Sequence, residues 1–143
     1  MQQLVVFSLG SEEYGLPITT VQEIIRYTRP RTIPSAPPSV RGVINLRGKI
    51  IPVVDLKARL QLAGGDAEES KIVIVEAGVV TAGLIVDDVD KVMTIDAADI
   101  DTNRAAEVPF IDGIAKVGDE LFVLLAPDAL VASFGIGLDT LAA

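Results

Sequence analysis

The feature of this sequence that most constrains its fold is an internal repeat. With an offset of 68, residues 4–7 align with residues 72–75, and residues 15–16 align with residues 83–84. A second offset, of 71, brings residues 42–54 onto later positions that again read glycine followed by aliphatic runs. The shared glycines and the shared order of segments predict two copies of one small unit.

Each copy has the composition of a small β unit. Half of the residues are apolar, but the aromatic residues are only four Phe and two Tyr, so Val, Ile, Leu and Ala must fill the core. We expect about five strands in each unit, closed into a barrel. Neither unit alone would bury enough surface, so the two should pack on each other. The predicted units are residues 1–68 and 69–143, with terminal segments able to cross between them.

The strongest local signal is a β-hairpin within residues 42–56. Two β-branched runs flank a polar break at residues 45–49, and Gly48 supplies the positive φ that a tight turn needs. This places Arg47 at an exposed tip, where it could be an ordinary solvated turn residue. In the second copy the same position is Gly118, so the fold does not require an arginine there. That difference favours a binding role for Arg47.

Residues 20–26 are predicted to form a helical turn or two. Thr20 is a suitable N-cap, and Glu23 follows it at the capping-box spacing. Val21, Ile24 and Ile25 then form an apolar stripe at helical spacing. The stripe could pack into the core, or it could form one wall of a groove that accepts a helix of a partner protein.

The connections are predicted from proline and glycine. Residues 28–41 contain four prolines and should form an extended loop. Short helices are expected at residues 55–60 and 127–133, the second with proline at its start.

Charge and composition exclude several classes of function. The chain has no Cys and no His, which removes thiolate nucleophiles, imidazole bases and the usual transition-metal ligands. Residues 1–68 hold eight basic and six acidic residues, a net charge of +2, and residues 69–143 hold four and fourteen, a net charge of −10. Such fields suit protein partners better than nucleic acid. Without a signal peptide or a membrane span, the chain is expected to be cytoplasmic.

One acidic cluster allows an enzymatic alternative. Asp87, Asp88 and Asp90 could hold calcium or magnesium, as in a small carboxylate-dependent metal hydrolase. Their spacing does not match an EF-hand loop, and a solvated acidic loop is the simpler interpretation. Residues 42–48 also do not form a phosphate loop, since Ile50 stands where a magnesium-binding hydroxyl is needed. We therefore predict no catalytic residue, metal ion or cofactor.

Several motifs resemble the CheW family of chemotaxis coupling proteins. They lie at residues 13–15, 21–24, 42–48 and 51–56, with a weaker match at residues 84–92. The pairing of Asn-Leu-Arg-Gly with Pro-Val-Val-Asp-Leu in a fixed register is the most specific of them. The resemblance implies two five-stranded SH3-like β-barrels around a shared apolar core, with short helices.

The resemblance also implies a function and its residues. Such proteins are non-enzymatic adaptors that link transmembrane chemoreceptors to a sensor histidine kinase in signalling arrays at the inner face of the membrane. The cytoplasmic hairpin tip of the receptor docks between the barrels, and the kinase regulatory domain docks on a barrel end. Asn45 and Gly48 are expected to shape the turn. By matching position, the coupling residues are Val21, Glu23, Gly42, Arg47 and Val89.

Overall fold

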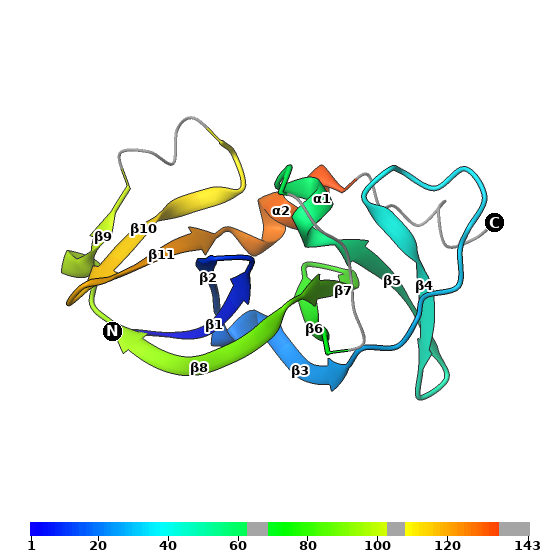
Figure 1. Ribbon diagram of the computed structural model, residues 1–143, viewed down its shortest axis with the longest axis horizontal. Helices are drawn as coiled ribbons and strands as arrows, with labels where there is room; N and C mark the ends of the chain where they lie inside the picture. The colour runs from blue at the N-terminus through cyan, green and yellow to red at the C-terminus, as the bar shows by residue number, and fades with distance from the viewer. Residues whose placement is uncertain (63–68, 103–107, 135–143) are drawn as a thin grey trace.

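The computed structural model describes residues 1–62, 69–102 and 108–134, and within them the chain is mostly β-strand (Figure 1). The strands are β1 (Gln2–Leu9), β2 (Glu12–Pro17), β3 (Val21–Arg26), β4 (Val40–Leu46), β5 (Lys49–Asp55), β6 (Lys71–Ala77), β7 (Val80–Val86), β8 (Asp88–Ile95), β9 (Ile100–Asp101), β10 (Ile111–Val117) and β11 (Glu120–Leu125). The helical segments are η1 (Ile18–Thr20), α1 (Leu56–Arg59), η2 (Ala97–Asp99) and α2 (Pro127–Ser133).

The strands form two mixed sheets. One has the order β8-β1-β2-β11-β10-β9, and the other has the order β3-β6-β7-β5-β4. The predicted all-β class, with two small sheets and short helices, is confirmed. Both predicted helices are present, and Asp55 caps α1 by accepting a hydrogen bond from the Ala58 N–H at 3.2 Å.

Each sheet takes strands from both halves of the chain. The β1–β2 hairpin of the first copy lies in one sheet with β8 to β11 of the second, and β6–β7 lies with β3, β4 and β5 of the first. A parallel pair joins β2 to β11 and another joins β5 to β7. The division at residue 68 therefore separates the two repeats along the chain and not the two sheets. A hairpin is encoded locally, whereas the choice of its neighbour depends on tertiary packing.

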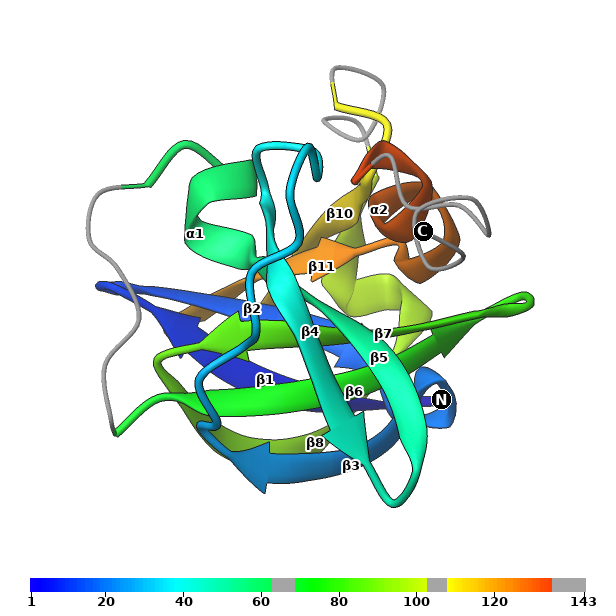
Figure 2. The ribbon, with the colours of Figure 1, turned by 90° about the vertical axis from the view of Figure 1, so that its right-hand side faces the viewer.

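The core is shared between the sheets. Its largest cluster joins Phe7 of β1, Leu84 of β7 and Leu130 of α2, and all three side chains are fully buried. Smaller clusters fill each barrel, around Phe122 in one and Ile74 in the other. Both helices lie at the junction, on the side of the molecule opposite β3 and β8 (Figures 1 and 2). No helix in the described ranges is long and apolar enough to span a membrane.

The predicted helix at residues 20–26 is wrong. Only a short 3₁₀ turn precedes Val21, and β3 then pairs antiparallel with β6. Exposure alternates along β3, so Ile24 and Ile25 face opposite sides and the stripe expected at helical spacing does not form. The capping spacing of Thr20 and Glu23 is a local signal, and the long-range ladder with β6 overrides it.

Candidate functional site

The β4–β5 turn presents Arg47 from an unusual backbone conformation. Leu46 and Lys49 pair across a two-residue turn in which Arg47 has φ +52° and Gly48 has φ +85°. The Asn45 side chain accepts a hydrogen bond from the Gly48 N–H at 2.8 Å. This geometry is a type I′ turn, which normally prefers glycine, asparagine or aspartate. The sequence predicted the positive φ of Gly48 but not that of Arg47.

The other three hairpin turns show what the fold prefers at this position. Gly10, Gly78 and Gly118 each open their turns with φ +62°. An L-residue other than glycine costs roughly 1 to 2 kcal/mol in this region. Arg47 therefore occupies a position at which glycine would fit with less backbone strain.

Arg47 reaches across the open side of the barrel to β3. Its Nη2 lies 2.8 Å from Glu23 Oε2, and the two side chains are 72% and 28% exposed. The hydrogen bond to Glu23 raises the pKa of Arg47 above its ordinary value. The second oxygen of Glu23, Oε1, is buried and has no hydrogen-bond partner among the residues that the structure describes. The structure thus brings together two residues that are 24 positions apart in sequence.

The other three predicted coupling residues occupy different places in the fold. Val21 begins β3 and Val89 lies in β8; both are half-buried and pack against the shared core cluster. Gly42 is buried at a bulge in β4 with φ +151°, and a Cβ there would lie 2.1 Å from the Arg31 carbonyl oxygen. Gly42 therefore admits the close approach of residue 31, which exchanges two backbone hydrogen bonds with Val43.

Two large aliphatic side chains on the strands next to this pair are exposed. Ile24 of β3 and Ile50 of β5 are both exposed, and Ile50 is 52% exposed. The sequence reasoning missed Ile50 as part of a surface. The available signal was the pair Ile50–Ile51 next to the turn. Neighbouring residues of a strand point to opposite faces, and here Ile51 is the buried one.

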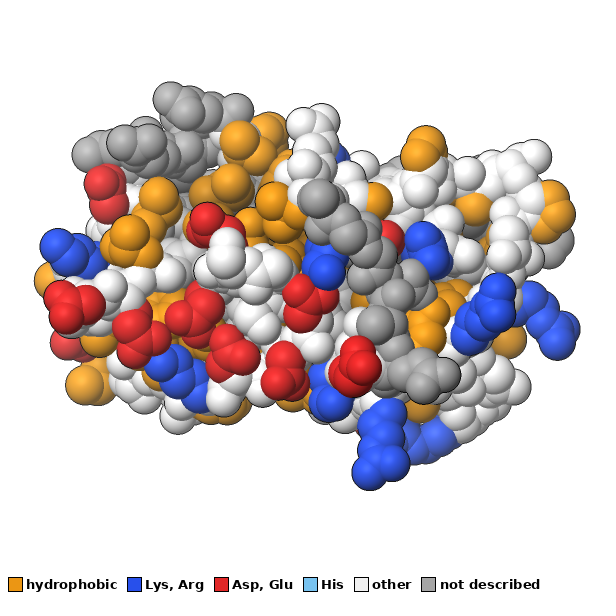
Figure 3. All heavy atoms as spheres, viewed as in Figure 1, with side chains coloured by type: hydrophobic (Ala, Val, Ile, Leu, Met, Phe, Trp, Pro, Cys, Tyr) orange, Lys and Arg blue, Asp and Glu red, His pale blue; other side chains and the backbone are white. Residues whose placement is uncertain are grey.

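The second copy also joins its edge strand to the following hairpin by an ion pair, with the charges reversed and with a hairpin residue that aligns with Lys49 and not with Arg47. Lys91 of β8 pairs with Glu120 of β11 at 2.7 Å, and Val92 and Leu121 are exposed beside them. These four residues align, at offsets of 68 and 71, with Glu23, Lys49, Ile24 and Ile50. Lys91 also lies 5.5 Å from the centre of the Phe122 ring. Basic side chains gather toward the β4–β5 end of the molecule and acidic ones over the β8 side (Figure 3).

The acidic cluster does not form a metal site in the structure. Asp87 is engaged by Lys57 at 2.5 Å and by the Gly10 N–H at 2.6 Å, while Asp88 accepts from the Val89 N–H. In the part of the chain that the structure describes, no three acidic side chains converge as metal ligands would. The hydrolase alternative gains no support from this geometry.

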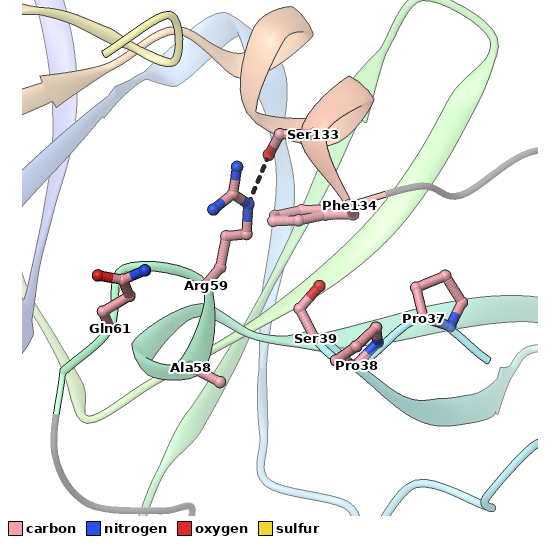
Figure 4. A pocket seen from close by; sticks show the side chains of 8 residues that line it. All are labelled: Pro37, Pro38, Ser39, Ala58, Arg59, Gln61, Ser133 and Phe134. Atoms are coloured by element: carbon pink, nitrogen blue, oxygen red, sulfur yellow. Dashed lines mark hydrogen bonds between the residues drawn. The ribbon is translucent and has the colours of Figure 1, made fainter. Parts of the chain in front are cut away.

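A pocket of about 440 Å³ lies between α1 and α2 (Figure 4). At its edge, Arg59 Nε donates to Ser133 Oγ at 2.9 Å, and the guanidinium lies 4.7 Å from the centre of the Phe110 ring. These contacts join a helix of the first copy to residues of the second. We assign them a structural role in holding the two copies together.

Comparison with known proteins decides the family. The family model described as a CheW-like domain matches residues 3–134. The chain belongs to the CheW family. The expected resemblance is therefore confirmed over essentially all of the described residues.

Individual members of the CheW family support the same assignment. The chemotaxis protein CheW of Klebsiella aerogenes is 33% identical over 137 residues, which cover 92% of this chain and 82% of that protein. CheW of Treponema pallidum is also 33% identical, over 142 residues, with the same coverage. The crystal structure of the scaffolding protein TtCheW from Thermoanaerobacter tengcongensis superposes with a TM-score of 0.81 at 41% identity, covering 87% of this chain and 88% of that one.

Proposed function

We propose that this CheW-family chain is a non-enzymatic adaptor that couples chemoreceptors to a sensor histidine kinase. The observation that carries the proposal is the Glu23–Arg47 pair, which joins the exposed β4–β5 turn to β3. The backbone at Arg47 would favour glycine, so the fold alone gives no reason for an arginine. An interaction with a partner protein would explain why an arginine is present.

The ion pair is better suited to recognition than to stability. An exposed pair of this kind contributes only about 0.2 to 1 kcal/mol to folding. It does hold the guanidinium in one position, with its remaining donors free to meet a carboxylate or carbonyl oxygen on a partner.

We assign the partners by the shape and chemistry of the surfaces. The helical hairpin tip of a receptor would meet β3 and β8 near Val21 and Val89, where half-buried aliphatic side chains cover the junction of the two copies. The regulatory domain of the kinase would meet the exposed aliphatic side chains Ile24 and Ile50. The adaptor would then be recruited to receptor arrays at the inner face of the membrane.

The experiment is reconstitution of kinase activation with purified receptor, kinase and adaptor. Arg47→His should retain the unfolding free energy within about 1 kcal/mol, because the side chain is exposed. It should lower receptor-dependent kinase activity at least tenfold. A matched control is Lys49→His, which changes an exposed basic residue two positions away.

A pull-down from a cell extract tests the partners directly. The wild-type chain should retain a chemoreceptor and a histidine kinase together, and Arg47→His should lose at least one of them. Normal kinase activation by Arg47→His in the reconstituted mixture would show that Arg47 has no coupling role.

A further inference from the structure

The two copies of the repeat differ in how a hairpin turn is joined to the nearby helix. Asp87, which lies in the second copy between β7 and β8, contacts both the β1–β2 turn and α1 of the first copy. Its Oδ2 accepts from the N–H of Gly10, in the β1–β2 turn, at 2.6 Å, and its Oδ1 lies 2.5 Å from Nζ of Lys57 in α1. The Lys57 side chain is only 13% exposed. We call the contacts of Gly10, Lys57 and Asp87 the latch.

The second copy has no latch. At the repeat offsets, Gly10 aligns with Gly78, Lys57 with Asp128, and Asp87 with Thr19. Within the described ranges, Asp128 makes no hydrogen bond or ion pair, and no side chain accepts from the Gly78 N–H.

A groove of about 300 Å³ lies at the unlatched position, between the β6–β7 turn and α2. The β6–β7 hairpin projects beyond the body of the sheets at this point (Figure 2). Val79, at its tip, is 93% exposed. The lining is mostly small and apolar, with one carboxylate: Ala77, Gly78, Val80, Asp128, Val131 and Ala132.

We propose that this groove binds a segment of a partner protein that carries a lysine or arginine next to a small aliphatic residue. The volume has room for one or two side chains. The cation would pair with Asp128, and the aliphatic side chain would contact Val80 and Val131. In the first copy the residue equivalent to Asp128 is Lys57, and its charge is neutralised within the chain by Asp87; a cation of the partner would do the same for Asp128.

The negative charge at the groove favours a basic segment over an acidic or a wholly apolar one. An acidic segment would be repelled by Asp128 and by a half of the chain with a net charge of −10. A wholly apolar segment would remove water from Asp128 without replacing its hydrogen bonds, which is unfavourable. A basic segment satisfies both the carboxylate and the apolar lining.

The test is titration of the full ¹⁵N-labelled chain with two probe peptides, followed by NMR. One peptide is acetyl-Gly-Ala-Lys-Val-Ala-amide, and the other carries glutamate in place of its lysine. The lysine peptide should shift the amide signals of Gly78, Val80 and Val131 in a saturable way. The glutamate peptide should bind at least fivefold more weakly.

Two variants test whether the lysine peptide binds at Asp128. Asp128→Asn should weaken binding of the lysine peptide at least fivefold, while Asp119→Asn, which changes an exposed acid in another turn, should leave it unchanged. Equal binding of the two peptides, shifts located away from the groove, or full binding to Asp128→Asn would each overturn the proposal. None of these outcomes depends on the coupling role of Arg47.

Discussion

Replacing Arg47 with glycine measures separately what this residue contributes to folding and what it contributes to binding. Glycine would remove a positive-φ strain of roughly 1 to 2 kcal/mol. It would add about 0.5 to 1 kcal/mol of unfolded-state entropy. It would also remove an exposed ion pair that contributes about 0.2 to 1 kcal/mol. These terms nearly cancel, so the unfolding free energy should stay within about 1 kcal/mol of wild type.

The binding result should be very different. Arg47→Gly deletes the only side chain that joins the turn to Glu23 in the described contacts, so receptor-dependent kinase activation should fall at least tenfold. Urea unfolding and the reconstituted kinase assay measure the two effects on the same protein. For a chain of this size, 1 kcal/mol corresponds to about 2 to 4 °C in Tm, so thermal unfolding is a second check.

The repeat offers a matched control for Arg47→Gly. Gly118 occupies the same position in the β10–β11 turn with φ +62°. Gly118→Arg should lower the unfolding free energy by roughly 1 kcal/mol, because it introduces the strain that Arg47→Gly removes. A loss of more than about 2 kcal/mol in Arg47→Gly would refute the reasoning and make Arg47 a structural residue.

Two further predictions concern Gly42 and Glu13. Gly42→Ala should lower the unfolding free energy by roughly 2 kcal/mol or more in urea unfolding, because its Cβ would collide with the Arg31 carbonyl oxygen. Gly48→Ala is the control: no atom lies within 4 Å of its Cβ, so it should lower the unfolding free energy by less. Burial, followed by a hydrogen bond with Asp90, raises the pKa of Glu13 above 4.5, so the folded protein holds this proton more tightly than the unfolded chain. Stability should therefore fall as pH rises above about 4.5, and the stability of Glu13→Gln relative to wild type should increase over the same rise in pH; a difference independent of pH would contradict this.

The repeat and most strand positions could be predicted because their signals are local. The β4–β5 hairpin follows from β-branched runs on both sides of Arg47 and Gly48, and α2 follows from a proline at its first position. β3 was misread because the spacing of Thr20 and Glu23 is also a local signal, and it pointed to a helix. The segment Val21–Arg26 is a strand because it pairs with β6. The residues of the segment alone do not indicate that pairing.

The sequence predicted several residues of the site but not how they are arranged. The resemblance named Glu23 and Arg47, but only the fold shows that the turn reaches β3 and joins them. Ile50 was missed because an aliphatic residue in a strand is expected to be buried unless the register is known. The positive φ of Arg47 also has no sequence signature, since arginine rarely adopts it.

The two copies have diverged where the fold leaves freedom, and this gives the molecule surfaces of different polarity. Both barrels place a charged residue of an edge strand beside a charged residue at a hairpin, but the order is Glu23–Arg47 in one and Lys91–Glu120 in the other. Each copy also exposes large aliphatic side chains on the same strands, Ile24 and Ile50 in one and Val92 and Leu121 in the other. Electrostatic complementarity must then determine which partner surface fits which barrel. An adaptor that must hold two different proteins at once needs such a difference, and two identical barrels could not provide it.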